Sequence, residues 1–143
     1  MRDPYTKLHL HLVWATWDRR SLIDPTMEEE LKRILGAKAR EMGCQALAMG
    51  GDYDHMHCLI RFTTTVTVAD IVGGLKGASS HWVNHTWRPS YTFKWQGSYG
   101  AFVVCEDALP NVEAYVRRQR QHHANRDLWE DWEQCFLPDP PEA

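Results

Sequence analysis

Two short segments of this chain place histidines two residues apart, and that spacing constrains the fold more than any other feature. In a β-strand, side chains at positions i and i+2 project from the same face. In residues 55–62 the leading His55 and His57 share a face, and Met56 points the other way. In residues 7–16 the alternation is regular, with one apolar face and one mixed face (Leu8, Leu10, Leu12 and Trp14 against His9, His11 and Val13). Both segments are therefore predicted to be strands.

Two further strands complete the predicted sheet. Residues 44–50 form a strand that a turn at residues 50–54 joins to the strand at 55–62. Two strands joined by so short a turn form an antiparallel hairpin. The fourth predicted strand spans residues 93–105 and is interrupted at Gly97-Ser98.

Helices are predicted between and after these strands. The first starts at Asp24-Pro25-Thr26 and stops at Gly43. The second follows a capping box formed by Thr67 and Asp70.

A third predicted helix spans residues 110–124, with Asp107 as its cap. The order is therefore β-α-β-β-α-β-α. It predicts an α+β fold: a ferredoxin-like four-stranded antiparallel sheet with helices on one face and an added C-terminal helix. Because this architecture hosts many functions, function has to be argued from the site.

The composition indicates one globular domain. A length of 143 residues is close to the usual domain size, and a hydrophobic content of 43% is typical of folded proteins. No apolar stretch approaches the roughly 18 residues that span a bilayer, and the N-terminus lacks the apolar core of a signal peptide. We therefore expect a cytoplasmic protein with no membrane partner, whose four cysteines are reduced and partly buried thiols.

Charge is unevenly distributed along the chain. All 16 Lys and Arg residues lie in residues 1–126 beside 13 acidic ones, and the other six acidic residues lie in 127–143. A mildly basic body permits an anionic partner such as nucleic acid, without requiring one.

The strand that begins at His55 carries the first candidate site. Both of its imidazoles can reach one metal ion, and Asp52 or Asp54 could ligate that ion or orient an imidazole. The alternative is that this spacing arises by chance in a chain with eight histidines. His9 and His11 repeat the geometry on the first strand, where they either face the same site or line a polar face of the sheet.

The third predicted helix carries the second candidate. Tyr115 and Gln119 are four residues apart, so they lie one above the other on one helix face. A phenol and an amide oxygen held side by side can serve as a nucleophile and a metal ligand. The alternative is a half-buried tyrosine with Gln119 at the rim. Basic side chains that suit phosphate flank this helix or can join it in space, although a solvated basic face also explains them: Lys76, Arg117, Arg118 and Arg120.

Together these features resemble the IS200/IS605-family transposases, the single-tyrosine enzymes of the HUH nuclease class. The resemblance covers about residues 5–125. Five blocks carry it in order, with His122-His123 after the last: 11–20 (HLVWATWDRR), 51–60 (GDYDHMHCLI), 75–80 (LKGASS), 95–102 (WQGSYGAF) and 114–119 (AYVRRQ).

The resemblance implies a metal-dependent DNA transposase. It implies that Tyr115 is the nucleophile and that His55, His57 and Gln119 bind one divalent ion, Mg²⁺ or Mn²⁺. Such an enzyme cleaves and rejoins single-stranded transposon ends with hairpins through a 5′-phosphotyrosine. The resemblance also implies a homodimer in which the tyrosine helix of one subunit can complete the site of the other.

On this interpretation, residues 1–126 form the transposase domain, residues 127–143 form an acidic tail, and the four basic residues bind DNA. A non-catalytic module that binds single-stranded nucleic acid also suits a ferredoxin-like sheet, but it needs neither Tyr115 nor Gln119. A metal-dependent hydrolase would activate water and leave no protein attached to DNA. The REP-associated tyrosine transposases are stand-alone relatives with the same chemistry, and the resemblance extends to them.

Overall fold

The computed structural model describes residues 4–121 and residue 133. Four strands form one antiparallel sheet in the order β2-β3-β1-β4, so β3 and β1 are central. This arrangement confirms the predicted α+β class and the predicted hairpin. The strands are β1 (His9–Ala15), β2 (Gln45–Asp52), β3 (His55–Arg61) and β4 (Gly100–Val103).

The first two helices begin where the sequence signals predict. The Asp24 carboxylate accepts a hydrogen bond from the N–H of Met27 at 2.8 Å, and the Thr67 hydroxyl accepts one from the N–H of Asp70 at 3.0 Å. Gly43, with a φ of 78°, follows the end of the first helix. The helices are α1 (Pro25–Glu41), α2 (Val68–Trp82) and α3 (Leu109–Arg117), with 3-10 turns η1 (Trp17–Arg19) and η3 (Glu106–Ala108) and a π-turn η2 (Val83–Trp87). None of the helices in the described part of the chain is long and apolar enough to cross a membrane.

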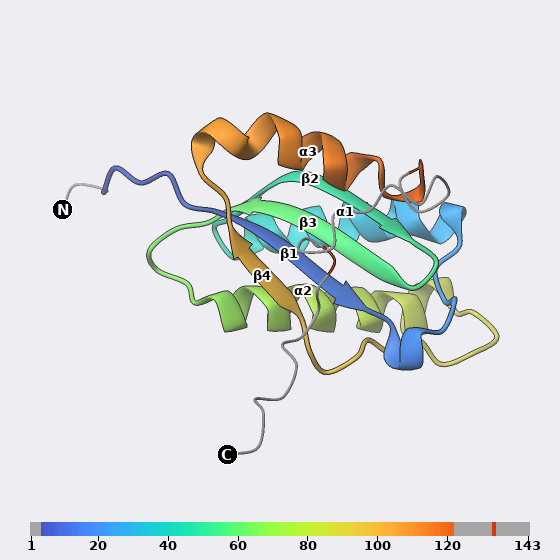
Figure 1. The fold of residues 1–143 in the computed structure, drawn as a ribbon. Helices are drawn as coiled ribbons and strands as arrows, with labels where there is room; N and C mark the ends of the chain where they lie inside the picture. The colour runs from blue at the N-terminus through green and yellow to red at the C-terminus, as the bar shows by residue number, and fades with distance from the viewer. Residues whose placement is uncertain (1–3, 122–132, 134–143) are drawn as a thin grey trace, which may run out of the picture.

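The sheet separates two hydrophobic layers. The larger core lies between the sheet and the crossover helices α1 and α2, and it takes the apolar face of β1 together with Met56, Cys58 and Ile60 of β3. The smaller layer lies on the other face, where Val112 and Val116 of α3 pack on the sheet. Figure 1 shows α3 and α2 on opposite sides of the sheet. The histidines of β1 and β3 point to the α3 side.

A glycine allows α3 to approach the sheet closely. A Cβ atom added to Gly50 of β2 would lie 1.9 Å from the carbonyl oxygen of Val116. The helix backbone therefore rests directly on the strand at this point. Arg117 adds a hydrogen bond from its guanidinium to the carbonyl of Leu47 at 2.8 Å. These contacts fix the helix that carries Tyr115.

The fourth strand is shorter than predicted. Beyond β4, the segment 93–105 contributes a single bridge between Thr16 and Trp95. The reason is Lys76, whose ammonium group donates to the carbonyls of Gln96 at 2.8 Å and Ser98 at 2.7 Å. These carbonyls are drawn toward α2, and the chain between them forms a loop.

The third helix is also shorter than predicted. Arg118, with φ −107° and ψ 31°, interrupts it. The Tyr115 carbonyl accepts from the N–H of Arg118 at 3.3 Å and from Nε2 of Gln119 at 3.0 Å, which closes the last turn. One further helical turn follows, and the predicted part beyond residue 121 lies outside the described residues. The predicted Asp107 cap is wrong, because the N-cap is Ala108 and Asp107 belongs to η3.

Candidate metal and nucleophile site

The structure brings together the four residues predicted to form the site. His55 and His57 lie at the start of β3 on the sheet face beneath α3, and both are buried. Tyr115 and Gln119, each 1% exposed, reach the same place from α3 and the turn after it. Nε2 of His55 is 3.3 Å from Oε1 of Gln119, and the Tyr115 ring meets the His57 ring edge-on at 5.9 Å between centroids. Gln119 is therefore not a rim residue.

Both imidazoles are oriented by hydrogen bonds at Nδ1. Oδ1 of Asp54 lies 2.8 Å from Nδ1 of His55, and Nε2 of His11 lies 2.7 Å from Nδ1 of His57. These partners turn the Nε2 atom of each imidazole toward the site. His11 thus faces the same site as the β3 histidines, as one of the two predicted alternatives requires. Of the two candidate aspartates, Asp54 forms the hydrogen bond at Nδ1 of His55.

The polar atoms that converge in the site carry lone pairs. Because the Asp54 carboxylate can only accept, the proton of a neutral His55 lies on Nδ1, and its Nε2 presents a lone pair. The Gln119 amide nitrogen donates to the Tyr115 carbonyl, so the amide oxygen faces His55. Burial, and secondarily His57, lowers the pKa of His11 to about 3. His11 is therefore neutral at physiological pH.

Glu133 also enters the site, and no local pattern in the sequence indicates this residue. Its Oε2 lies 2.6 Å from Nε2 of His57 and 4.0 Å from Nε2 of His55, while its Oε1 accepts a hydrogen bond from the Tyr115 hydroxyl at 3.0 Å. The residue belongs to the segment predicted as an acidic tail. The sequence shows only that this segment, residues 127–143, is rich in acidic residues, and it does not indicate which of them enters the site.

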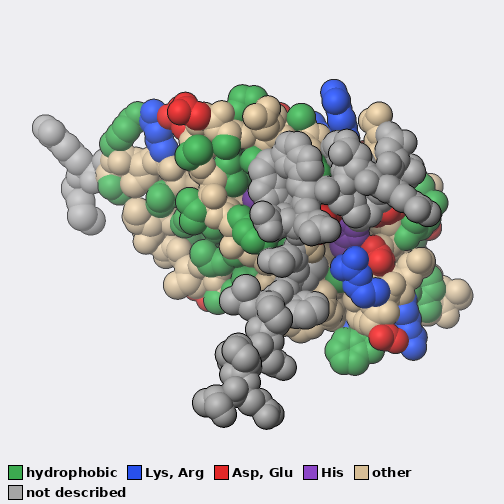
Figure 2. All heavy atoms as spheres, viewed as in Figure 1, with side chains coloured by type: hydrophobic (Ala, Val, Ile, Leu, Met, Phe, Trp, Pro, Cys, Tyr) green, Lys and Arg blue, Asp and Glu red, His purple; other side chains and the backbone are tan. Residues whose placement is uncertain are grey.

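The donor set fits a divalent cation. One ligand atom each from His55, His57 and Glu133 lie within 4.8 Å of one another, and the Gln119 oxygen is adjacent. Two imidazole nitrogens with carboxylate and amide oxygens suit Mn²⁺ better than Mg²⁺, which prefers an all-oxygen shell. A cation at this point would take the place of the contacts that Glu133 and Gln119 make with the two imidazoles. Figure 2 shows histidine surface on this side of the molecule, with basic and acidic side chains beside it.

Two of the basic side chains predicted to bind DNA hold parts of the fold together. Lys76 donates to two carbonyls of the loop that follows Trp95, as described above. Arg117 pairs with Glu113 at 3.1 Å in addition to its bond to the Leu47 carbonyl. Neither cation therefore extends freely into solvent.

The other two predicted DNA-binding residues differ in their surroundings. The Arg120 guanidinium pairs with Asp52 at 3.2 Å and with the buried Glu28 at 3.4 Å, and it lies over the Tyr53 ring. Arg118 is exposed at the break in the helix, and no described acidic residue forms an ion pair with it. Arg118 is consequently the most available of the four for an anionic ligand.

The chain is thus an α+β protein with a histidine pair on the central strand β3. These histidines face a tyrosine on α3, the helix that follows the last strand. The sequence model of the family "Transposase IS200 like" matches residues 4–119. The chain therefore belongs to the IS200-like transposase family. No curated protein matches the chain.

Two solved structures share this fold. A protein of Deinococcus radiodurans R1 assigned as a transposase, determined at 1.90 Å, is 27% identical, with a TM-score of 0.67 over 83% of this chain and 95% of that chain. A REP-associated tyrosine transposase bound to a REP hairpin is 14% identical, with a TM-score of 0.63 over 100% of this chain and 93% of that chain. The first supports the family assignment, and the second shows the fold alone.

Proposed function

We propose that this transposase cleaves and rejoins single-stranded DNA ends, with Tyr115 as the nucleophile and a 5′-phosphotyrosine as the intermediate. The observation that carries the proposal is the position of the Tyr115 hydroxyl. It is buried against the His57 ring and bonded to Glu133, beside a set of atoms that fits a cation. A tyrosine that served only packing would not need its hydroxyl among metal-ligating groups.

The chain supplies a nucleophile and an acceptor for its proton. Oε1 of Glu133 already accepts the hydrogen bond from the Tyr115 hydroxyl, so it is placed to take that proton as the phenol oxygen attacks phosphorus. The new bond joins the tyrosine oxygen to phosphorus, and the bond from phosphorus to the 3′ oxygen breaks. The released 3′ oxygen takes up a proton and becomes a hydroxyl. Attack by a 3′-hydroxyl on the phosphotyrosine reverses the step and joins strands without ATP.

The metal-binding groups we propose are His55, His57 and Gln119, with Glu133 added from the geometry. A bound divalent ion, Mn²⁺ or Mg²⁺, would neutralise charge on the phosphoryl oxygens as the tyrosine attacks. Asp54 and His11 hold the two imidazoles in the orientation that this requires. The amide nitrogen of Gln119 fixes its oxygen toward the site.

The partners we propose are single-stranded DNA with hairpin ends and a second copy of the chain, in the cytoplasm. A REP hairpin is bound in one structure of the same fold, which supports a hairpin ligand here. Arg118 is the basic residue best placed to contact DNA, while Lys76, Arg117 and Arg120 would act mainly by holding the surrounding loops. In this chain Tyr115 lies beside its own histidines, so one chain contains a full set of site residues. The homodimer stays a prediction from the family.

The test is a search for the covalent intermediate. The full chain is incubated with Mn²⁺ and a labelled single-stranded oligonucleotide from its own element's end, and the products are separated on a denaturing gel. We expect a labelled band shifted by one protein mass, which is lost in Tyr115→Phe while DNA binding is kept. Cleavage without a shifted band, equal in wild type and Tyr115→Phe, would support a hydrolase and refute Tyr115 as nucleophile.

A further inference from the structure

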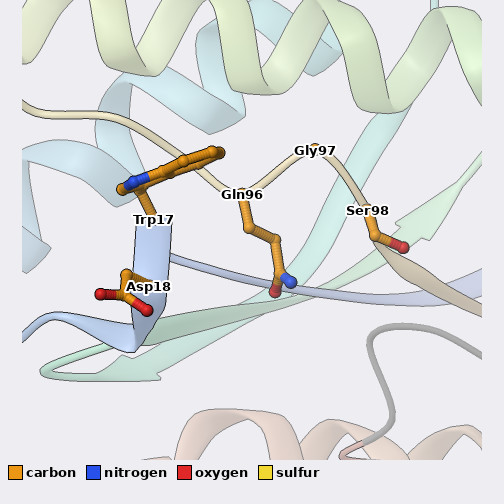
Figure 3. A pocket seen from close by; sticks show the side chains of 5 residues that line it. All are labelled: Trp17, Asp18, Gln96, Gly97 and Ser98. Carbon is orange, nitrogen blue, oxygen red and sulfur yellow. The ribbon is translucent and has the colours of Figure 1, made fainter.

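A depression opens between the turn that follows β1 and the loop that precedes β4. It has a volume of about 680 Å³, within the range of pockets that bind small ligands. Figure 3 shows how its walls are built: Trp17 and Asp18 come from the turn after β1, and Gln96, Gly97 and Ser98 come from the loop that precedes β4. The proposed chemistry uses none of these five residues.

Trp17 is the aromatic wall of this depression. Its side chain is 47% exposed, and the Lys94 ammonium lies 3.8 Å from its ring centroid. Trp14 and Trp95, by contrast, are buried in the main core and contact each other edge-on. An indole held at the surface by a cation offers an apolar face of the kind on which bases stack.

Gln96 supplies a polar group that lacks a partner. Its Oε1 is fully buried and accepts no hydrogen bond from the described part of the chain. The main chain of Gln96 is held on both sides, because its N–H donates to the Ala15 carbonyl at 2.9 Å and its carbonyl accepts from Lys76. A buried acceptor on a fixed backbone costs free energy until a donor reaches it. In Figure 3 the Gln96 amide extends from the loop toward β1.

The turn that carries Trp17 has an unusual backbone. Asp18 and Arg19 both have left-handed φ values, 55° and 52°. Two consecutive non-glycine residues in this region are strained, and such strain persists where surrounding contacts enforce it. Here the Thr16 hydroxyl donates to the Arg20 carbonyl at 2.6 Å across the turn. This hydrogen bond holds the turn in its left-handed conformation, and the turn thereby places Trp17 and Asp18 along the depression.

The same turn is connected to the proposed metal site. The N–H of Thr16 donates to the Asp54 carbonyl at 2.8 Å, and the Arg19 guanidinium lies 3.4 Å from the Asp54 carboxylate. That carboxylate is the group that orients His55. The turn that forms one wall of the depression is therefore linked through Asp54 to His55, the histidine proposed to bind metal.

We propose that this depression is a subsite for one unpaired base of the single-stranded DNA substrate. The base stacks on Trp17, and the Gln96 side chain, which lines the depression, turns its buried Oε1 toward an N–H on the edge of that base. The proposal rests on the proposed function for the identity of the ligand, but it concerns residues that take no part in the chemistry. In this proposal, Trp17 contributes to the affinity for single-stranded DNA, and Gln96 contributes to the preference for one base over another.

Equilibrium binding of two probes separates base contacts from backbone contacts. The protein is the full chain carrying Tyr115→Phe, which prevents cleavage, and the probes are an oligothymidylate of about 12 nucleotides and an abasic strand of the same length. Adding Trp17→Ala should weaken binding of the oligothymidylate by about tenfold, since one base stack is worth that order of affinity. Binding of the abasic strand should not change. Trp17→Phe, which keeps an aromatic face, should retain most of the affinity.

Two further variants sharpen the test. Tyr5→Ala removes another exposed aromatic residue that lies beside a lysine, and it should leave both probes unaffected because Tyr5 precedes the start of β1 whereas Trp17 follows its end. Gln96→Ala should narrow the difference in affinity among oligothymidylate, oligocytidylate and oligoadenylate. If Trp17→Ala weakens both probes equally, or neither, the base subsite is refuted.

The covalent assay distinguishes this proposal from the proposed function. If wild type forms the adduct but Trp17→Ala binds both probes like its parent, the subsite fails and the function stands. If Trp17→Ala selectively loses the base-containing strand while wild type forms no adduct, the subsite stands and the tyrosine mechanism fails.

Discussion

The contact between Gly50 and α3 allows a direct test of how the proposed nucleophile, Tyr115, is held in position. In Gly50→Ala, the new Cβ would lie 1.9 Å from the Val116 carbonyl oxygen and 3.0 Å from its carbonyl carbon. Both atoms belong to helix backbone, so no side-chain rotation can relieve the clash. The helix has to withdraw from β2, and it carries Tyr115, the residue before Val116, with it.

The size of the effect follows from this geometry. Restoring an ordinary contact of 3.4 Å requires a displacement of about 1.5 Å, and a misplacement of a reacting group by even about 1 Å can lower a rate by about a hundredfold. Overpacking of this kind costs about 1–3 kcal/mol of folding stability. The histidines proposed to bind the metal lie on β3 and do not have to move. We therefore expect adduct formation in Gly50→Ala to fall by about a hundredfold, with Mn²⁺ affinity changed far less.

The measurement is the single-turnover rate of adduct formation, together with Mn²⁺ titration and a urea unfolding curve. Gly77→Ala is the matched control, because a Cβ at Gly77 of α2 meets nothing within 4 Å and alanine favours a helix by about 1 kcal/mol. That variant should be as active as wild type and slightly more stable. An unchanged rate in a folded Gly50→Ala would refute the idea that this close approach positions the tyrosine.

Two other predictions concern the histidines and the carboxylate of the site. His11→Phe removes the group that orients His57, and Glu133→Ala removes a proposed ligand. Each substitution should weaken Mn²⁺ binding by about tenfold or more in a calorimetric titration, and an unchanged affinity would exclude that residue from the metal site. Burial and His57 lower the pKa of His11 from 6.5 to about 3, so between these values the unfolded chain binds a proton that the folded chain does not. The free energy of unfolding should therefore keep the whole contribution of His11 above pH 6.5. Between pH 6.5 and about pH 3 it should fall by about 1.4 kcal/mol for each pH unit. Urea unfolding in EDTA at several pH values should show that the free energy of unfolding depends on pH with this slope in wild type and with a shallower slope in His11→Phe. Equal slopes would contradict the conclusion that His11 is buried in its neutral form.

The sequence predicts those parts of the fold that depend on neighbours along the chain. The period of two in β1 and β3, the Asp24 and Thr67 caps and the stop at Gly43 are all local signals, and each is confirmed. The i, i+4 spacing of Tyr115 and Gln119 places both side chains in the site, although the helix breaks between them. The break itself depends on which carbonyl the Gln119 side chain reaches, which spacing does not reveal.

The features that the sequence does not predict arise from contacts between distant segments. The fourth strand is short because Lys76 of α2 takes the carbonyls of a loop some twenty residues further on. Glu133 reaches His57 from a segment with no helical or strand period that would place it. Trp17, and not the more central tryptophans, lines a depression because a strained turn holds its side chain outward. None of these features can be derived from a local pattern, because each depends on segments that come together only when the sheet has formed.

The alternation in the two central strands has a consequence for folding fidelity. Each strand presents hydrocarbon to the main core and histidines to the opposite face, with His11 of β1 facing Leu59 and Val13 facing His57 across the ladder. A slip of one residue in either strand would turn its imidazoles into the core and its core residues toward α3. Burying imidazoles without partners costs several kcal/mol, so misregistered sheets are selected against during folding. Molecules that reach a stable fold should therefore be uniform in their site, and refolded protein should recover its full activity per folded molecule.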